Sequence, residues 1–298
     1  MKNLPFGQPG RFYRGNLHTH STNSDGFLEV GEVCHRYRQA GYDFISLSEH
    51  FMAHYDYPIT DTRAFRSDDF TTLIAAELHQ GKTSVGETWH ILAVGVPVDF
   101  ARPGPDENAV QIAERAAAAG AFIGIVHPSW YGLTTDDAKT IACAHAVEIY
   151  NHGSKVEVER GEDWPFLDLL LNEGWRLSGF ATDDAHHITH DAFGGWINVH
   201  ADSLDPDVLL DSMKAGRYYS SQGPEIHDIR IADGELHVEC SPAANISLQG
   251  RGARSKYLSG DLMTKATFPT DRFEDAYVRV TVRDDQGRRA WSNPIWFD

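Results

Sequence analysis

The chain has 298 residues, enough for two ordinary domains or one large barrel. Its 26 Lys and Arg residues against 43 Asp and Glu residues give a formal net charge of −17, and the basic residues are scattered. This charge argues against polymeric nucleic acid and anionic membrane surfaces as partners. The 16 histidines, beside only 3 cysteines and 4 methionines, favour a hard or borderline metal held by nitrogen and oxygen ligands.

The cysteines and the apolar segments indicate the compartment. Cys34, Cys143 and Cys240 are isolated and odd in number, which argues against a disulfide framework and a thiolate zinc site. The first residues contain no long apolar segment, and no run of about 18 apolar residues occurs elsewhere. We expect a soluble, cytoplasmic protein, and the sequence predicts no particular oligomeric state.

Short apolar runs alternate with helix-like stretches through the first two thirds of the chain. The expected strands are residues 14–17, 44–47, 73–76, 90–96, 122–126, 147–150, 177–181 and 196–199. The expected helices are residues 29–40, 107–119, 136–144, 164–172 and 206–215, the last with Pro206 in its first turn behind the capping acid Asp205. Alternation at this spacing predicts a mostly parallel α/β fold, and about seven such units would close into a barrel.

The pattern changes after residues 222–224. No helix is expected from residue 226 onward, and alternating apolar residues occur at 229–231, 236–238, 246–248 and 277–282. Residues 284–287, Asp-Asp-Gln-Gly, are typical of a turn between strands. We therefore predict two parts, a barrel over residues 1–222 and a small all-β module over residues 223–298 packed on it.

Side chains that can bind metals follow the expected strands. His18 and His20 close the first strand, and their spacing of two residues directs both rings to one side. Further such residues after strands or in adjoining turns are Asp25, His50, Glu77, His127, Asp184 and His186. The carboxyl ends of strands in such folds converge on one opening, where sites are built. His90 is the exception, because it begins its apolar run.

A single histidine at a strand end is more often structural, but many at matching positions favour a cluster. Burying carboxylates among histidines costs several kcal/mol, and a divalent cation is the simplest compensation. We expect structural or exposed positions for His35, His145, His200, His227 and His237, and more often than not for His54, His79, His187 and His190. Trp130, on the loop after His127, is a candidate wall of the substrate pocket.

These motifs resemble the PHP (polymerase and histidinol phosphatase) family of metal-dependent hydrolases. The matching segments are His18-Thr19-His20, Ser24-Asp25-Gly26, Ser48-Glu49-His50, Glu77, His90-Ile91-Leu92, His127-Pro128 and Asp184-Ala185-His186. The resemblance implies a distorted (β/α)7 barrel and a multinuclear site of two or three divalent ions, Zn, Mn or Fe. It places the metal ligands at His18, His20, Asp25, His50, Glu77, His90, His127, Asp184 and His186. Asp183 adjoins Asp184, and the Asp-x-His spacing favours Asp184.

The tail is similar to a different branch of the same family. Residues 216–219, 221–224 and 289–296 resemble the carbaryl-hydrolase (CehA/McbA-type) branch, which includes enzymes that cleave carbamate esters. This similarity leaves the substrate class open.

A cluster of cations about 3.5–4 Å apart can lower the pKa of a bridging water and so supply hydroxide near neutral pH. We predict that Glu77 bridges two metals, that Asp184 orients the nucleophile, and that His186 or His152 protonates the leaving group. Asn151 and His152 end a strand and are candidates for substrate contact. Lys155, with Arg160, supplies the only cations nearby in sequence.

The leading hypothesis is a phosphoesterase that acts on a small phosphomonoester or phosphodiester through a metal-bridged hydroxide. The first alternative is a metal-dependent hydrolase of a carbamate, ester or amide. The second is a catalytically idle metal-binding or regulatory module, which the nine filled ligand positions disfavour. The expected partner is a small, phosphorylated molecule, without polymeric nucleic acid or membrane.

Overall fold

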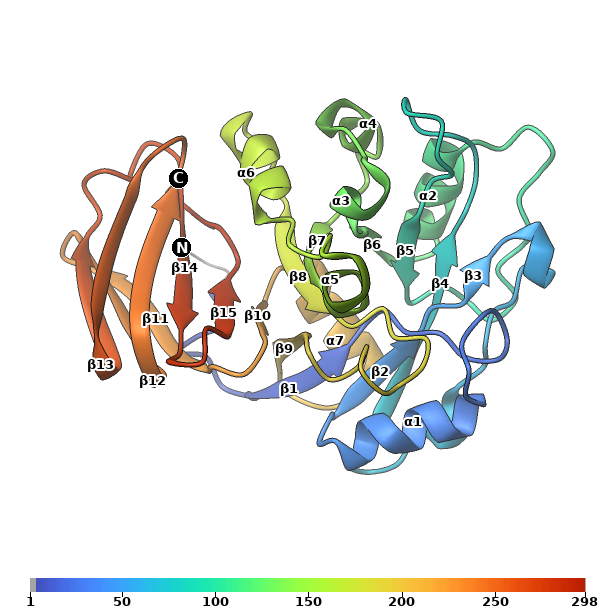
Figure 1. Ribbon diagram of the computed structural model, residues 1–298, viewed down its shortest axis with the longest axis horizontal. Coiled ribbons are helices and arrows are strands. Elements are labelled where there is room, and N and C mark those ends of the chain that lie inside the picture. The colour runs from blue at the N-terminus through green and yellow to red at the C-terminus, as the bar shows by residue number, and fades with distance from the viewer. Residues whose placement is uncertain (1–3, 298) are drawn as a thin grey trace.

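The computed structural model describes residues 4–297 and has a mixed α/β architecture (Figure 1). The strands are β1 (Arg11–Asn16), β2 (Phe44–Leu47), β3 (His50–Phe51), β4 (Thr71–Leu78), β5 (Ile91–Val94), β6 (Phe122–Ile125), β7 (Ala146–Asn151), β8 (Ser178–Thr182), β9 (Trp196–Ala201), β10 (Tyr218–Ser221), β11 (Ile226–Ala232), β12 (Glu235–Gly250), β13 (Ser255–Pro269), β14 (Tyr277–Arg283), β15 (Arg289–Ser292) and β16 (Ile295–Trp296). The α-helices are α1 (Val30–Gln39), α2 (Ala109–Ala118), α3 (Pro128–Tyr131), α4 (Thr135–Thr140), α5 (His152–Val158), α6 (Trp164–Asn172) and α7 (Pro206–Lys214). Two 3-10 turns cover Ala53–Tyr55 and Arg63–Phe65.

One continuous sheet runs through the described residues, in the order β11-β12-β14-β15-β10-β9-β1-β2-β4-β5-β6-β7-β8. The pairs β1–β2, β2–β4, β6–β7 and β7–β8 are parallel, as the alternation of strands and helices predicts. The pairs β1–β9 and β9–β10 are antiparallel, so the sheet is mixed and not mostly parallel as expected. Strand β5 is antiparallel to both β4 and β6, because a loop without a helix joins β4 to β5 and allows the chain to reverse.

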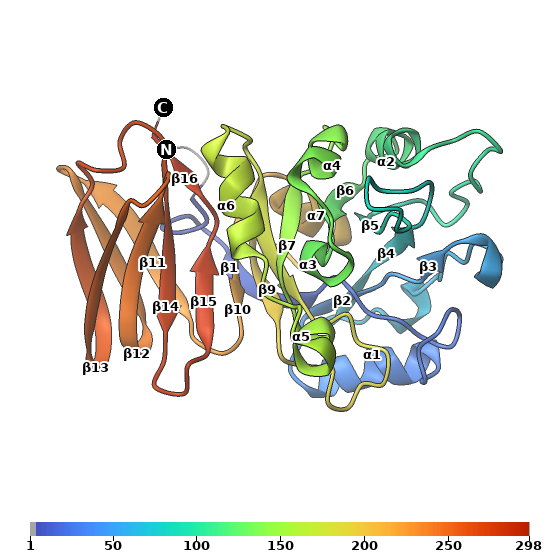
Figure 2. The same cartoon turned by 45° about the horizontal axis from the view of Figure 1, so that its top comes forward.

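The last strand in this order, β8, lies beside β10, which stands in the middle of the order. The hydroxyl of Ser220 on β10 accepts a hydrogen bond from Ala181 N (3.1 Å) and donates one to Gly179 O (3.1 Å), both on β8. Strands β1–β8 are thereby curled into a barrel-like arrangement surrounded by helices (Figures 1 and 2). Buried side chains such as Leu17, Phe122 and Phe180 belong to one of the apolar clusters of its core.

Two helices illustrate how local sequence sets their limits. The Asp205 carboxylate accepts hydrogen bonds from Asp207 N and Val208 N, with Pro206 in the first turn, so the predicted start of α7 is confirmed. Helix α2 begins with a capping box between Asn108 and Gln111. Helices α3 and α5 were not expected, since each is a single short segment directly after a strand.

The C-terminal strands extend the same sheet through the antiparallel pair β10–β15. Residues 226–297 contain no helix, in agreement with the prediction, and the turn at 284–287 joins β14 to β15. Strand β12 is one 16-residue strand across two of the expected segments, and β13 was missed because most of its side chains are exposed. Phe6 and Tyr219 belong to the apolar core of these strands, so packing is continuous across the predicted boundary at residue 222.

The predicted limits of the two parts include residues 1–3 and 298, which lie outside the described residues. Among residues 4–297, no helix combines the length and the apolar character needed to cross a membrane.

Candidate metal centre

Two segments far apart in sequence lie side by side at the carboxyl ends of β1 and β8. Thr19 and Ala185 form a parallel bridge, His20 N donates to Ala185 O (3.0 Å), and Asp184 N donates to His18 O (2.9 Å). These backbone contacts place the His-x-His and Asp-x-His motifs against each other. His20 Nε2 consequently lies 3.1 Å from Asp184 Oδ1.

Glu77, at the end of β4, lies at the centre of the cluster and is fully buried. The register of β3 on β4 pairs His50 with Glu77. Glu77 Oε1 lies 2.7 Å from His90 Nδ1 and 3.2 Å from His127 Nε2. Its Oε2 lies 2.6 Å from His50 Nδ1 and 3.6 Å from His18 Nε2. Each oxygen of this carboxylate therefore faces its own set of imidazoles.

Nitrogen and oxygen donors within 4.8 Å of one another form several overlapping groups, each able to hold a metal ion. These groups are His20-Asp25-His50-His186, His18-His127-Asp184, His18-His20-Glu77, His50-Glu77-His79 and Glu77-His90-His127. All nine residues predicted as ligands occur in at least one group. His79 adds a tenth donor that the sequence reasoning set aside.

The position of His90 follows from the direction of its strand. His90 directly precedes β5, which runs antiparallel to β4 and β6. The amino end of β5 therefore lies beside the carboxyl ends of its neighbours. His90 is no exception to the rule that the donors gather at one opening.

Burial and mutual charge shift the titration of these groups. Burial opposes ionisation of Glu77 and Asp184, but the surrounding histidines hold the pKa of both carboxyls well below the usual range. Burial lowers the pKa of His18, yet Asp184, Glu148 and Glu77 together raise it well above the ordinary value. Burial, with the neighbouring rings of His186 and His50, lowers the pKa of His20 to about 3. Without a cation, the centre thus combines ionised carboxylates with imidazoles shifted in opposite directions, His18 towards the protonated form and His20 towards the neutral form.

The donor set fits a divalent metal. His18 Nε2 is buried without a hydrogen-bond partner, although it lies 3.2 Å from Asp184 Oδ1 and 3.6 Å from Glu77 Oε2. A nitrogen aimed at two carboxylates without a hydrogen bond suits coordination to a shared cation. Imidazole and carboxylate ligands without thiolate agree with Zn, Mn or Fe.

Glu148 on β7 supports the centre from behind and was missed by the sequence reasoning. Its Oε1 lies 3.1 Å from His18 Nδ1 and accepts a hydrogen bond from the hydroxyl of Thr182. Its Oε2 accepts from His127 N (2.7 Å) and Asn151 Nδ2 (2.9 Å). A carboxylate in the middle of an expected buried strand was the available signal.

Both carboxylate oxygens of Asp183, the neighbour of Asp184, accept hydrogen bonds. Asp183 accepts from the backbone N–H groups of Phe193, Gly194 and Gly195 and from the Tyr37 hydroxyl. Asp183 therefore orders the loop before β9, whereas its neighbour Asp184 faces His18 and His20.

Glu49 is buried one residue before His50. It accepts hydrogen bonds from the hydroxyls of Ser21 and Ser24 and from Ser21 N (3.2 Å), and burial raises its pKa. Glu49 thereby fixes the loop that carries Asp25. Its signal was a carboxylate adjoining a predicted ligand.

Of the three residues between 151 and 155 that are predicted to contact substrate, only Asn151 contacts a residue of the cluster. Asn151 donates from Nδ2 to Asp184 Oδ2 (3.0 Å), so it positions a predicted ligand. The Nδ1 atom of His152 lies 3.0 Å from the Tyr150 hydroxyl, and His152 does not line the cavity. Lys155 forms ion pairs with Glu159 (2.8 Å) and Glu162 (3.4 Å) at the surface.

A cavity of about 360 Å³ opens over the cluster. It is lined by Asp25, Phe27, His50, His90, His127, Trp130, Gly153, Ser154, Glu157, Asp184, His186 and His187. Trp130 forms part of its wall, and none of the described lining residues is Lys or Arg. Arg160 instead donates to Trp130 O (3.1 Å).

Two residues of the cluster have left-handed backbone conformations. His127 has φ 29° and Asp184 has φ 55°. Non-glycine residues in such conformations cost roughly 1–3 kcal/mol each and persist where surrounding contacts determine them. Here the backbone N–H of His127 is held by Glu148 and that of Asp184 by His18 O, so the same contacts that stabilise the strained turns orient the donors.

The fold is shared with a protein of known structure. A two-domain protein from Bacteroides vulgatus, containing a predicted PHP-like metal-dependent phosphoesterase, matches with a TM-score of 0.56 and 15% identity, over 98% of this chain and 97% of that chain. This similarity supports a barrel-like mixed α/β fold shared with a PHP-like structure.

Two further solved structures match less completely. PsfC from Pseudomonas syringae matches with a TM-score of 0.45 and 14% identity, over 68% of this chain and 88% of that chain. An amidohydrolase from Chromobacterium violaceum matches with a TM-score of 0.43 and 13% identity, over 60% and 89%. No family model matches the sequence, and no curated protein is significantly similar to it.

Proposed function

We propose that this chain is a PHP-type metal-dependent hydrolase that cleaves a small phosphomonoester or phosphodiester. Within this proposal, residues 1–222 form a distorted (β/α)7 barrel and residues 223–298 a C-terminal all-β module. The observation that carries the proposal is Glu77, whose two buried oxygens face separate sets of histidines. A carboxylate so placed can offer one oxygen to each of two cations. The free cysteines Cys34, Cys143 and Cys240 support a cytoplasmic location.

Two or three divalent ions, Zn, Mn or Fe, would be held by His18, His20, Asp25, His50, Glu77, His90, His127, Asp184 and His186. Such ions, when bound, supply a nucleophile by lowering the pKa of water and neutralise charge that develops on substrate oxygens. His79 is an additional candidate ligand, since its Nε2 lies 2.8 Å from His50 Nδ1 and 3.4 Å from Glu77 Oε2.

The chain's own residues hold these donors in one orientation. Asn151 fixes one oxygen of Asp184, which leaves the other directed at His18 and His20. The contact of His18 Nδ1 with Glu148 makes Nδ1 the protonated nitrogen, so Nε2 is the ligand atom. Trp130 closes one side of the cavity.

His186 is better suited to bind a metal than to protonate the leaving group. Its Nδ1 lies 3.0 Å from Asp184 O, and a carbonyl oxygen only accepts, so Nδ1 carries the proton. The other nitrogen, Nε2, then presents a lone pair 3.4 Å from Asp25 Oδ1. His152, directed at Tyr150, is also poorly placed as a general acid.

The second candidate function is hydrolysis of a carbamate, ester or amide at the same centre. The absence of Lys and Arg from the described cavity lining favours it, because a phosphate group is usually held by at least one such cation. The −17 charge and the lack of a basic track argue against polymeric nucleic acid in either case.

The test uses the full chain loaded in turn with Mn²⁺, Zn²⁺ or Fe²⁺. Hydrolysis of p-nitrophenyl phosphate, bis-p-nitrophenyl phosphate, p-nitrophenyl acetate and an aryl N-methylcarbamate is measured side by side. We expect metal-dependent turnover of a phosphate ester, which chelator removes and metal restores. Turnover of the acetate or carbamate alone would refute the phosphoesterase assignment, and no turnover at full metal content would indicate an idle metal-binding module.

A further inference from the structure

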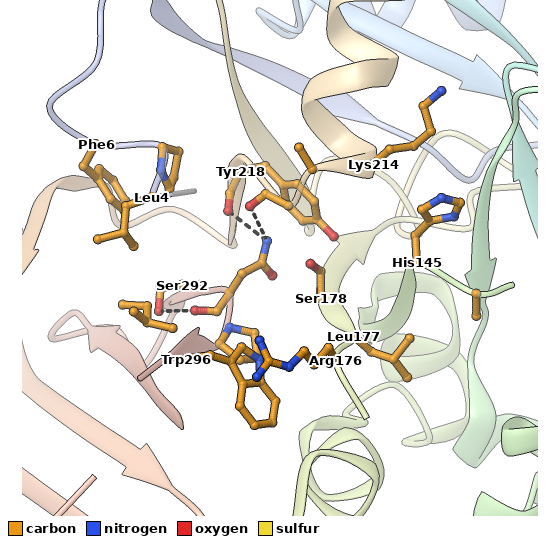
Figure 3. Close-up of a pocket in the computed structure, with 17 residues that line it drawn as sticks. Leu4, Phe6, His145, Arg176, Leu177, Ser178, Lys214, Tyr218, Ser292 and Trp296 are labelled. Atoms are coloured by element: carbon orange, nitrogen blue, oxygen red, sulfur yellow. Dashed lines mark hydrogen bonds between the residues drawn. The ribbon is translucent and has the colours of Figure 1, made fainter. Parts of the chain in front are cut away.

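A second pocket, of about 610 Å³, lies at the other end of the barrel strands (Figure 3). His145, on its wall, directly precedes β7, whereas Asn151 at the far end of β7 contacts the metal centre. At about 3.3 Å per residue, the strand separates the two places by about 20 Å. The pocket therefore lies apart from the proposed catalytic site.

The titratable residues that line this pocket are basic, unlike most of those in the chain as a whole. Its described lining contains Arg176, Lys214 and His145 but no Asp or Glu, although the chain has 43 acidic residues and a net charge of −17. Lys214 Nζ lies 3.1 Å from Gly120 O and 3.2 Å from Asp211 Oδ1, so two contacts hold its ammonium group in place. An ammonium has three donors, and one is left for a ligand.

Neutral donors add to this positive character. Ile123 N donates to His145 Nδ1 (3.0 Å), so a neutral His145 ring carries its proton on Nε2 and can donate it. Tyr218 is only 1% exposed, and its hydroxyl makes no hydrogen bond of good geometry among the described residues, although the polar side chains of Ser178 and Asn293 lie close enough to oppose the rise in its pKa that burial causes. A buried hydroxyl without a good hydrogen bond is unfavourable, and a ligand oxygen in the pocket would satisfy it.

The opposite side of the pocket is apolar. Figure 3 shows Leu4 and Phe6 across the pocket from Lys214 and His145. The guanidinium of Arg176 lies over the Trp296 ring, 4.8 Å from its centroid, on a third side. Acceptor-binding groups and apolar surfaces thus occupy separate walls of a pocket large enough for a small organic molecule.

We propose that this pocket binds a small organic anion, with its acidic group held by Lys214, His145 and Tyr218 and its apolar body against Phe6 and Trp296. This site is additional to the metal centre and does not depend on the hydrolase assignment.

The experiment uses the full chain with its metals, and measures binding of benzoate, phenyl phosphate and the neutral benzyl alcohol by calorimetry and tryptophan fluorescence. We expect at least one of the two anions to bind and benzyl alcohol to bind at least about tenfold more weakly, since a charged hydrogen bond is lost. Tyr218→Phe and Lys214→Met should each weaken anion binding about tenfold or more. Lys82→Met, at an exposed lysine that contacts Thr88, is the matched control and should bind as the wild type does.

The stability of the unliganded Tyr218→Phe variant distinguishes a ligand-binding role of the Tyr218 hydroxyl from a structural one. Because the Tyr218 hydroxyl makes no hydrogen bond of good geometry, Tyr218→Phe should leave the unliganded protein about as stable as the wild type while it weakens binding of the anion. The proposal is overturned if neither anion binds, if Tyr218→Phe and Lys214→Met bind the anion with wild-type affinity, or if Asp184→Asn at the metal centre abolishes binding.

Discussion

The carboxylate of Glu148 receives four donors, and Glu148→Gln tests whether these contacts set the metal-binding form of His18. One oxygen faces His18 Nδ1 and the Thr182 hydroxyl, and the other faces His127 N and Asn151 Nδ2. Glutamine places an NH2 group opposite one of these pairs. A backbone N–H cannot become an acceptor, whereas a hydroxyl can rotate and an imidazole can change its tautomer.

The NH2 group should therefore face His18, which must then accept at Nδ1 and carry its proton on Nε2. That nitrogen is the atom directed at Asp184 and Glu77, so one proposed metal ligand would be lost. Changes to residues that orient metal ligands usually cost 10–100-fold in metal affinity. We expect a loss of this size, about 1.4–2.8 kcal/mol.

The affinity is measured by competition with a chelator, together with metal content and the ¹⁵N chemical shifts of the histidines in the zinc-loaded protein. Glu159→Gln is the matched control, because it makes the same chemical change at a residue whose carboxylate is in an exposed ion pair with Lys155. Affinity within about threefold of wild type, with His18 still bound through Nε2, would refute the reasoning.

Three further predictions concern stability and the metal. Burial raises the pKa of Asp163 to about 7 despite its hydrogen bonds from Ser129, so the folded state binds this proton more tightly than the unfolded state, and stability falls as pH rises from about 4 towards 7. In urea unfolding, the free energy of unfolding of the wild type should fall by on the order of 3 kcal/mol between about pH 5 and about pH 8, and Asp163→Asn should abolish this fall. An unchanged dependence of the free energy of unfolding on pH in the variant would contradict the prediction. Gly26→Ala should lower the free energy of unfolding by about 2 kcal/mol or more and should also lower the metal content, because its Cβ would lie 2.5 Å from the backbone carbon of His20. A variant with the melting temperature and metal content of the wild type would contradict this prediction. Chelation should lower the melting temperature, since Glu77 and Asp184 then lose the cations that compensate their burial, and re-addition of metal should restore it; an equal melting temperature with and without metal would oppose a multinuclear centre.

Much of the candidate metal centre was predictable because its information is local. Strands are recognised from short apolar runs, and His18, His20, His50, Glu77 and His127 occur at strand ends, where side chains of neighbouring strands converge. The Asp-x-His spacing was enough to choose Asp184 over Asp183.

The supporting residues depend on pairings that no local pattern contains. Glu148 is recognisable as a buried carboxylate, but three of its four donors, His18, His127 and Thr182, come from other segments of the chain. His79 resembles any histidine after a strand until β3 is paired with β4, which brings His50 within 2.8 Å of it.

The sequence by itself determined the donor residues, their place at strand ends and the start of helices such as α7, because side-chain chemistry and capping act over a few residues. Only the tertiary structure decided that β5 runs antiparallel and so turns His90 into the cluster, and that β10 and β15 join the C-terminal strands to the same sheet. It also directs the His152 ring at Tyr150, so that His152 does not line the cavity. The physical reason is that strand direction and register are chosen by contacts between distant segments, and a reversed strand exchanges its two ends without any change in its local sequence pattern.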